Sequence, residues 1–480
     1  MTTHRGQSDV RTEGFRNATE QPVPTELPSE GVIPTWLAGT LLRNGPAHFG
    51  EGRTALRHWF DGLAMVHRFH LEGGRVTYSN SFLDTPNKRA LADAGKLTYP
   101  EFATDPCRSL FKKIFTHFST DRPSNYNGSV NIARIDGKVS GITETPLPIE
   151  FDPATLETVG VVDYDDRLRG NVTSAHPGVH PGSGDLVNYL IRFSRQSSYT
   201  VYRQPSDSSS RSAVAVIPVD RPSYMHSFAV TENHAVLVEF PHVVDPLSFV
   251  LRNRAFIKNY RWKPRRGTNI RVIDLETGEV NTLHLPEPLF AFHHVNAFAD
   301  PHAPKRLHLD LVGYSDTAIL NSFYLDNLRS GKPIPHADLI RIDLDLEEGT
   351  AERRILTSMG AELPRIDPDR EGLPYRFAYG IRASSERGFY DRLVKVDTHS
   401  GEHLVWEQEG LYPGEPVFVP SPDRDPHDED DGVILAVALD LHGRSSVLLV
   451  LDARDMRELG RARTPQTIPF GFHGTFIDPQ

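Results

Sequence analysis

The amino-acid sequence predicts an all-β protein, most simply a β-propeller, and three observations carry this prediction. Apolar residues at the 3.6-residue period of a helix are scarce after the first 30 positions. Short apolar runs such as "AVLVEF" (235–240), "VILAVAL" (433–439) and "SVLLVLD" (446–452) alternate with Gly, Pro, Asp and Asn, as is typical of strands and their turns. A strand that ends in Asp, then a turn, then another strand recurs along most of the chain.

The recurring turn is a weak internal repeat that supports this prediction. In each copy an Asp follows an apolar pair and begins a tight turn, where its carboxylate can accept hydrogen bonds from backbone N–H groups ahead of it. Turns of this kind also occur in β-sandwiches, but one hairpin per blade is the pattern of a propeller, and the number of copies favours the propeller. The copies are "EFDPATLETVG" (150–160), "VIDLETGEV" (272–280), "RIDLDLEEGT" (341–350), "KVDTHSGEH" (395–403) and "VLDARDMREL" (450–459).

Composition limits the class of protein. The chain has 480 residues with a single cysteine, Cys107, so an intrachain disulfide framework is excluded and a reducing, cytoplasmic location is expected. The net charge of -11 argues against nucleic acid as the main partner. We expect no secretory signal, because the polar N-terminus has no apolar segment, and no membrane span. Residues 1–30 are expected to form a loosely held arm, and residues 31–480 a single domain.

Two stretches depart from the β pattern. "SLFKKIFTHF" (109–118) and "PLSFVLRNRAFIKNYRWKP" (246–264) combine apolar and aromatic residues with basic ones, and the first has helical spacing. Helices of this composition can lie in a membrane surface. The alternative is that they cap the mouth of the propeller and pack on its core.

Four of the 22 histidines stand out by their context. Each follows an apolar or small residue and precedes a strand-like segment: His176 in "VTSAHPGVH", His226 in "PSYMHSFAVTEN", one of the pair His293/His294 in "LFAFHHVNAFAD", and His473 in "PFGFHGTF". Their separation excludes a local zinc-finger site. In a propeller, however, the inner strands face one axis, where four imidazoles could form a metal cage.

Three buried carboxylates would support such a cage. An all-imidazole donor set suits iron, copper, nickel or zinc, and a metal-bound imidazole usually donates its other N–H to a carboxylate or carbonyl. Glu144, Glu362 and Glu415 lie in apolar or turn contexts that fit this role. One histidine alone would more often be a core residue bonded to the backbone, but four with three matching acids favour the metal.

At this point the sequence resembles a known family, the carotenoid cleavage oxygenases, which are non-haem iron enzymes on a seven-bladed propeller. The resemblance runs nearly end to end and rests on the order of eight motifs. These are "GTLLRNGP" (39–46), "HWFDGLAMVHRF" (58–69), "TSAHP" (173–177), "MHSFAVTEN" (225–233), "FHHVNAF" (292–298), "GEPVFVP" (414–420), "DEDDGVIL" (428–435) and "GFHGTF" (471–476). It implies a seven-bladed propeller whose helices and loops cap the mouth over an axial iron.

The resemblance also implies roles for individual residues. The Fe(II) ligands would be His176, His226, His293 and His473, because the first histidine of the pair is the ligand in this family. Glu144, Glu362 and Glu415 would orient three of the imidazoles, and Thr143 would crowd the open iron position. The aromatic residues expected to line a polyene tunnel are Tyr224, Tyr314, Tyr412, Phe60 and Phe102, although each could be ordinary core. Cys107 matches a cysteine that is lipidated in one branch, and we expect it to be free here.

The implied reaction is oxidative cleavage of one polyene double bond by O2 to give two aldehydes. The favoured substrate is β-carotene or an apocarotenal, cleaved at the 15,15′ bond to retinal, with the enzyme docked peripherally on a membrane. An isomerohydrolase of retinyl esters or a stilbene-cleaving enzyme on the same fold is an alternative. A propeller that binds carotenoid or a protein partner without turnover is a third reading, which the complete ligand set argues against.

Overall fold

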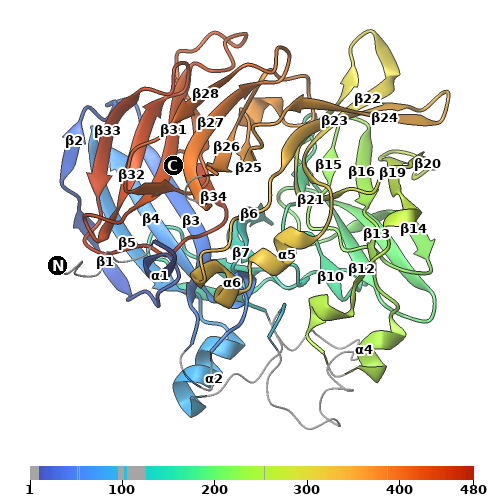
Figure 1. Cartoon of the computed structure of the whole chain (residues 1–480), viewed down its shortest axis with the longest axis horizontal. Coiled ribbons are helices and arrows are strands. Elements are labelled where there is room, and N and C mark those ends of the chain that lie inside the picture. Colours follow the sequence, from blue (N-terminus) through green and yellow to red (C-terminus); the bar gives the residue numbers. More distant parts are fainter. Residues whose placement is uncertain are drawn as a thin grey trace, which may run out of the picture.

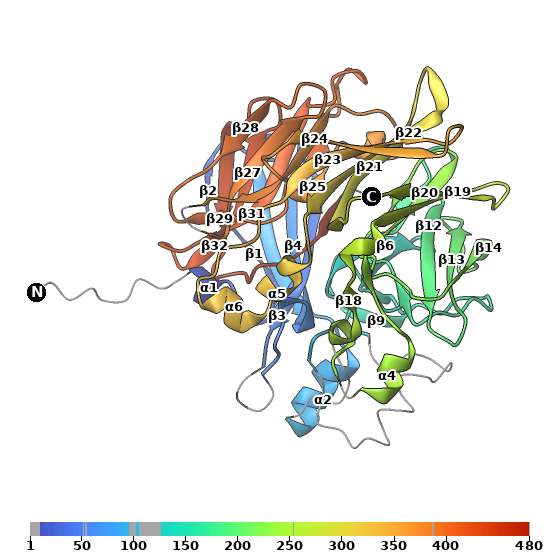
Figure 2. The same ribbon diagram turned by 45° about the vertical axis from the view of Figure 1, so that its right-hand side comes forward.

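The computed structural model describes residues 10–50, 52, 55–95, 102–104, 126–252, 254–385 and 388–479. Within them, seven antiparallel sheets of four to six strands surround a common axis (Figures 1 and 2). This arrangement confirms the predicted all-β propeller and its seven blades. A two-stranded sheet of β17 (His242–Val243) and β18 (Arg261–Trp262) lies outside the blades.

The blades are numbered here from the sheet that contains the first long strand. Blade 1 consists of β1 (Gln21–Glu26), β3 (Gly39–His48), β4 (Leu63–Glu72), β5 (Arg75–Phe82) and β34 (Gly474–Ile477). Blade 2 consists of β6 (Asn131–Ile135), β7 (Lys138–Ile142), β8 (Ile149–Phe151) and β9 (Thr158–Val161). Blade 3 consists of β10 (Val172–Thr173), β11 (Gly178–Val179), β12 (Leu186–Arg192), β13 (Ser197–Gln204) and β14 (Ser212–Val219).

The remaining blades follow in chain order, and the last one also takes a strand from the N-terminal region. Blade 4 consists of β15 (Ala229–Val230), β16 (His234–Glu239), β19 (Thr268–Asp274) and β20 (Val280–Leu285), and blade 5 of β21 (Phe290–Asp300), β22 (Ala303–Tyr314), β23 (Asp338–Asp345) and β24 (Thr350–Thr357). Blade 6 consists of β25 (Glu362–Arg365), β26 (Phe377–Ala383), β27 (Tyr390–Asp397) and β28 (His403–Trp406). Blade 7 consists of β2 (Ser29–Gly31), β29 (Leu411–Pro413), β30 (Val417–Pro420), β31 (Gly432–Asp440), β32 (Ser445–Asp452) and β33 (Glu458–Arg463).

The five predicted Asp turns are the outer hairpins of five blades. They join β8 to β9, β19 to β20, β23 to β24, β27 to β28 and β32 to β33. In the turn of blade 4, Asp274 accepts hydrogen bonds from the backbone N–H groups of Glu276 (2.9 Å) and Thr277 (2.7 Å). The same geometry holds at Asp152, Asp345 and Asp397. The carboxylate therefore satisfies the turn backbone, as the sequence predicted.

The ring closes through the two ends of the chain. Strand β34 pairs antiparallel with β3, with Arg43 opposite Gly474 and Thr40 opposite Ile477. Strand β30 of blade 7 contacts β34 of blade 1. The segment expected to be a loose arm also takes part from Gln21 onward: β1 pairs with β5, and β2 pairs with β33. Backbone pairing therefore ties this part of the arm to blades 1 and 7.

Short helices and loops lie on one side of the propeller (Figures 1 and 2). They are α1 (Val10–Glu13), α2 (Pro86–Ala94), α4 (Leu247–Leu251), α5 (Ala318–Ser322) and α6 (Leu325–Arg329), with 3-10 turns η2 (Trp59–Asp61), η3 (Phe256–Asn259) and η4 (Pro264–Arg266). A further 3-10 turn, η5 (Pro368–Arg370), follows β25 in blade 6. Residues 246–264 form α4 and η3 and not one longer helix, because the backbone turns extended at Arg252 (φ -116°, ψ 125°). The stretch 109–118 and Cys107 lie outside the described residues.

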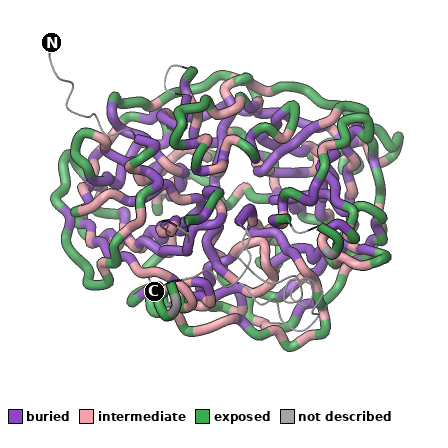
Figure 3. Tube along the Cα trace, turned by 60° about the horizontal axis from the view of Figure 1, so that its bottom comes forward, coloured by how far each residue is buried: buried purple, intermediate pink, exposed green. Residues whose placement is uncertain are grey.

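Burial follows this architecture. The inner parts of the blades are buried and the outer edges exposed (Figure 3). The largest apolar cluster joins the cap residues Trp59 and Phe323 to blades 4 to 7. In the described part of the chain, no helix combines the length and the apolar character needed to span a membrane.

Candidate metal centre

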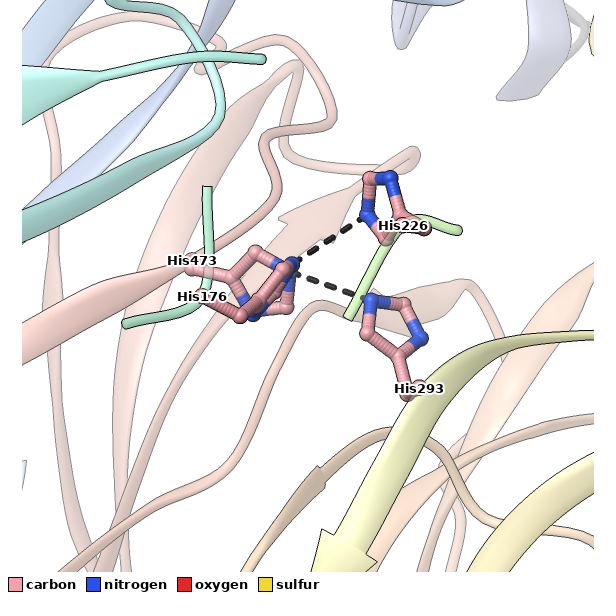
Figure 4. Close-up of side chains that lie close together, drawn as sticks. All are labelled: His176, His226, His293 and His473. Carbon is pink, nitrogen blue, oxygen red and sulfur yellow. Dashed lines mark hydrogen bonds between the residues drawn. The ribbon is translucent and has the colours of Figure 1, made fainter. Parts of the chain in front are cut away.

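Four histidine side chains meet at the propeller axis (Figure 4). They are His176, His226, His293 and His473, and one ring nitrogen of each lies within 4.8 Å of the others. The Nε2 atoms of His176 and His226 are 3.2 Å apart, as are those of His293 and His473. Three of the four residues are buried. The sequence prediction that these distant histidines converge is therefore confirmed.

Each of the seven blades supplies one residue to this centre or its support. The four histidines come from blades 3, 4, 5 and 1 in chain order. The three glutamates come from the other blades: Glu144 from blade 2, Glu362 from blade 6 and Glu415 from blade 7. The axis is the one place where loops and inner strands of all blades meet, so residues hundreds of positions apart become neighbours.

Local irregularities aim two of these side chains. The pairing of β21 with β22 is interrupted around His293, between Ala291 and His294, and such a bulge changes the direction of a side chain within a strand. Glu362 begins β25, and the next residue, Leu363, has a positive φ of 48°. A non-glycine residue in this region is strained, and such strain is often found at functional sites.

Three of the imidazoles are oriented by carboxylates. His226 Nδ1 lies 2.7 Å from Glu144 Oε1, His293 Nδ1 lies 2.6 Å from Glu362 Oε2, and His473 Nδ1 lies 2.7 Å from Glu415 Oε1. The metal hypothesis asked for carboxylates beside the imidazoles, and the structure places these three glutamates there. An Nδ1–H donated to a carboxylate fixes both the ring orientation and the tautomer, and leaves the Nε2 lone pair for a metal.

This tautomer makes the centre fit a cation. Burial lowers the pKa of His473 to about 3, so this ring is neutral at neutral pH. In the neutral form, His293 and His473 both carry their proton on Nδ1, so the 3.2 Å contact between their Nε2 atoms brings two lone pairs together. A cation between the four nitrogens would turn this repulsion into coordination. Four neutral imidazoles suit a borderline divalent metal such as iron, copper, nickel or zinc.

The three carboxylates are themselves held in different ways. The hydroxyl groups of Tyr224 and Tyr314 donate to Glu144 (2.7 Å) and Glu362 (2.5 Å). Glu415, which is completely buried, instead accepts from the guanidinium groups of Arg43 and Arg365. Burial alone would raise the pKa of Glu415, but these two cations and His473 lower it far below 4.5.

A cavity adjoins the imidazoles. Apolar and aromatic side chains dominate its wall, and three of the four histidines face it. The lining residues are Trp59, Phe60, Val130, His226, Phe292, His293, Phe323, Glu362, Leu363, Tyr390, Phe472 and His473.

The residues predicted to contact substrate fall in different places. Phe60 lines the cavity, and Phe102 packs on it with ring centroids 5.1 Å apart. Tyr224 and Tyr314 are buried beside the cavity, where they bind the glutamates. Tyr412 is buried on β29 and does not line this cavity.

Thr143, predicted to crowd the open metal position, lines a separate cavity between blades 2 and 3. The side chain that lines the central cavity from blade 2 is Val130, whose carbonyl accepts a hydrogen bond from the backbone N–H of His473. A buried valine before a strand carries no signal of function, so sequence reasoning missed it. Phe292 and Phe472 could have been found, because each directly precedes one of the four converging histidines.

Comparisons with known proteins agree with this geometry. The model of the family described as "RPE65: Retinal pigment epithelial membrane protein" matches residues 14–478. The chain belongs to this family. It is 31% identical over 520 residues to the mitochondrial carotenoid-cleaving dioxygenase of Mustela putorius furo, covering 95% of this chain and 94% of that protein. It is 30% identical over 522 residues to the β,β-carotene 15,15′-dioxygenase of Rattus norvegicus, covering 96% and 90%.

Solved structures of the family share the fold. The cobalt-substituted apocarotenoid oxygenase (ACO) of Synechocystis superposes with a TM-score of 0.86 at 26% sequence identity, covering 98% of this chain and 99% of that one. Because cobalt has been substituted into that relative, a member of the family can be studied with a metal that is visible by spectroscopy.

Proposed function

We propose that this protein is an Fe(II)-dependent dioxygenase that cleaves one double bond of a carotenoid or apocarotenoid with O2. The convergence of four imidazoles beside an apolar, aromatic cavity carries the proposal, since it joins a redox-capable metal site to a place for a polyene. Fe(II) would be held by His176, His226, His293 and His473. When bound, it would supply the activation of O2.

The cavity wall suits a conjugated hydrocarbon. Trp59, Phe60, Phe292, Phe323 and Phe472 present ring faces and edges, and the ring of Phe60 stacks on His226 with centroids 5.8 Å apart. Aromatic rings exclude water and stabilise positive charge on a polyene through their faces. In the overall reaction both atoms of O2 enter the products, one at each carbon of the broken double bond, and two aldehydes result.

A row of aromatic rings leads from the cavity toward α4. Phe60 contacts Phe102 (5.1 Å between centroids), Phe102 contacts Phe256 (6.3 Å), and Phe256 stacks on Phe249 (5.5 Å, 5° between planes). Phe249 lies on α4. We infer that this row marks the path by which the substrate reaches the cavity.

The surface at the end of this path fits a membrane. Leu247 and Leu251 on α4 expose 62% and 78% of their area, and basic Arg252, Arg254 and Lys258 follow them in exposed positions. Exposed apolar side chains beside basic ones bind the surface of anionic bilayers. A carotenoid resides in a bilayer, so peripheral docking there would let it pass directly into the protein.

We propose the central 15,15′ bond of β-carotene, or the equivalent bond of an apocarotenal, as the cleavage site. The relatives named β,β-carotene 15,15′-dioxygenase support this choice. Regiospecificity would come from positioning, because the cavity decides which double bond lies beside the imidazoles.

Product analysis tests the proposal. The Fe(II)-loaded protein is incubated aerobically with β-carotene, an apocarotenal, a stilbene and a retinyl ester, and the products are separated by chromatography. We expect retinal from β-carotene, and none from protein carrying His293→Ala. Aldehydes from the stilbene alone, or a retinol isomer from the ester, would move the assignment to another activity. No product from any of them would overturn it.

A further inference from the structure

Two arginine side chains, one from blade 1 itself and one from blade 6, bind the segment that carries His473. Arg43 on β3 donates from Nη2 to the carbonyl of Phe472 at 2.8 Å. Arg365 on β25 donates from Nη2 to the carbonyl of Gly474 at 2.5 Å. The backbone on both sides of the fourth imidazole is therefore fixed by charged donors.

The same two arginines hold the carboxylate that orients this imidazole. Arg365 Nε donates to Glu415 Oε1 at 2.8 Å, the atom that also receives His473 Nδ1 at 2.7 Å. Arg43 Nη1 donates to Glu415 Oε2, which also accepts the backbone N–H of Gly474 at 2.9 Å. Each oxygen of Glu415 thus binds one arginine and one group of the 473–474 segment.

This arrangement differs from the support of the other two carboxylates. Among the hydrogen bonds of the described residues, Glu144 and Glu362 receive tyrosine hydroxyls and no arginine. Two guanidinium groups around one completely buried carboxylate bring like charges together, with the Arg43 side chain only 7% exposed. Burying charge in this way is costly unless the geometry it imposes is needed.

His473 also differs from the other ligands in its place in the fold. It directly precedes β34, the strand that completes blade 1 and closes the ring. The other three histidines lie within blades that are continuous in sequence. The groups that hold it come from blade 1 itself (Arg43) and from blades 6 and 7 (Arg365 and Glu415).

We propose that Arg43 and Arg365 are positioning residues for the fourth imidazole: through Glu415 and the carbonyls of Phe472 and Gly474 they set His473 at the distance that completes the metal centre. The inference rests on the proposed metal site, but not on carotenoid cleavage. It assigns to two arginines of the blade strands a role in metal affinity.

Titration of the metal-free protein with Co²⁺ tests this role, with visible absorption as the readout. Mutation of a residue that supports a metal ligand typically weakens metal affinity by about 10–100-fold. We expect Arg43→Met and Arg365→Met each to weaken Co²⁺ binding about tenfold and to alter the absorption of the bound ion. Arg43→Lys, which keeps a donor and a charge, should recover part of the affinity.

Arg341→Met is the matched control. Arg341 forms a buried ion pair with Asp310 on blade 5, and the two side chains are 7% and 0% exposed, as are those of Arg43 and Glu415. This variant should lower the melting temperature like Arg43→Met but leave Co²⁺ affinity unchanged. Equal affinity in all three methionine variants would overturn the inference.

A double-mutant cycle asks whether the arginine acts through the carboxylate. In a Glu415→Gln background, Arg43→Met should add little further loss, because the shared partner is already changed. A full additional tenfold loss would contradict the mechanism. If Arg43→Met does not fold, Arg365→Met decides, since its side chain is 28% exposed and its replacement disturbs packing less. Failure of the unmutated protein to bind Co²⁺ would instead refute the metal centre itself.

Discussion

Asp61 is a completely buried carboxylate next to the cavity, and the donors described around it are all neutral. Its oxygens accept hydrogen bonds from the backbone N–H groups of His58 (3.1 Å) and Ala103 (2.9 Å) and from the hydroxyl of Thr104 (2.5 Å). Burial raises the pKa of Asp61 from 3.8 to about 6, despite these bonds. This carboxylate joins the turn that carries Phe60 to the segment that carries Phe102.

The raised pKa predicts how stability changes with pH. The folded protein binds this proton more tightly than the unfolded chain, so the stabilisation is complete below about pH 4 and is lost as the pH rises through about 6. At about 1.4 kcal/mol per pKa unit, the whole effect is about 3 kcal/mol. Because proton binding is linked to folding, about 1.4 kcal/mol of this stabilisation is lost between pH 5 and pH 7.5.

Urea unfolding of the wild-type protein and of Asp61→Asn at these two pH values measures the effect. The stability of wild type relative to Asp61→Asn should fall by about 1.4 kcal/mol from pH 5 to pH 7.5. Asp166→Asn is the control: burial would raise the pKa of Asp166, but Arg211 outweighs this and lowers it. The difference in unfolding free energy between wild type and Asp166→Asn should therefore stay constant from pH 5 to pH 7.5. A constant difference for Asp61→Asn as well would refute the reasoning from burial.

Three further predictions concern the metal centre and the surface. Glu362→Gln should weaken Co²⁺ binding about 10–100-fold in the absorption titration, because the amide no longer orients the imidazole; unchanged affinity would contradict this. Tyr314→Phe keeps the aromatic ring and loses only the hydroxyl that donates to Glu362. A few-fold loss of Co²⁺ affinity would show that Tyr314 supports this glutamate, whereas a loss of cleavage rate alone would show that it contacts the substrate. Leu247→Asp with Leu251→Asp should reduce sedimentation with anionic vesicles at least tenfold, while Leu404→Asp, on an exposed strand of blade 6, should leave it unchanged.

The outer hairpins of five blades were predictable from the sequence, because each depends on an interaction between residues close together in the chain. An Asp that caps its own turn is visible in five outer hairpins, because the interaction spans only two or three residues. Blade 1 makes the corresponding turn with Gly73 and Gly74 at positive φ, and blade 3 uses a longer connection between Gln204 and Ser212, so neither matched the repeat.

The four histidines at the axis were predictable from the sequence, and the residues around them were less so. A histidine in an apolar segment stands out in the sequence, because a polar side chain that is buried there needs a partner. Val130 and Tyr390 line the cavity without any such conflict, since a buried valine or tyrosine is ordinary in a core. The roles of Arg43 and Arg365 depend on contacts across 372 and 50 positions of sequence, and no local pattern encodes them.

The closure of the ring also has a consequence for biosynthesis. The four imidazoles leave the ribosome in the order of the chain, so His473 emerges last, long after His293. Arg43, Arg365 and Glu415 all precede His473 in the chain. The residues that hold this last imidazole are therefore translated before the imidazole itself. A nascent chain with six complete blades can offer a metal at most three imidazoles, and full coordination marks the moment at which the first blade receives its last strand.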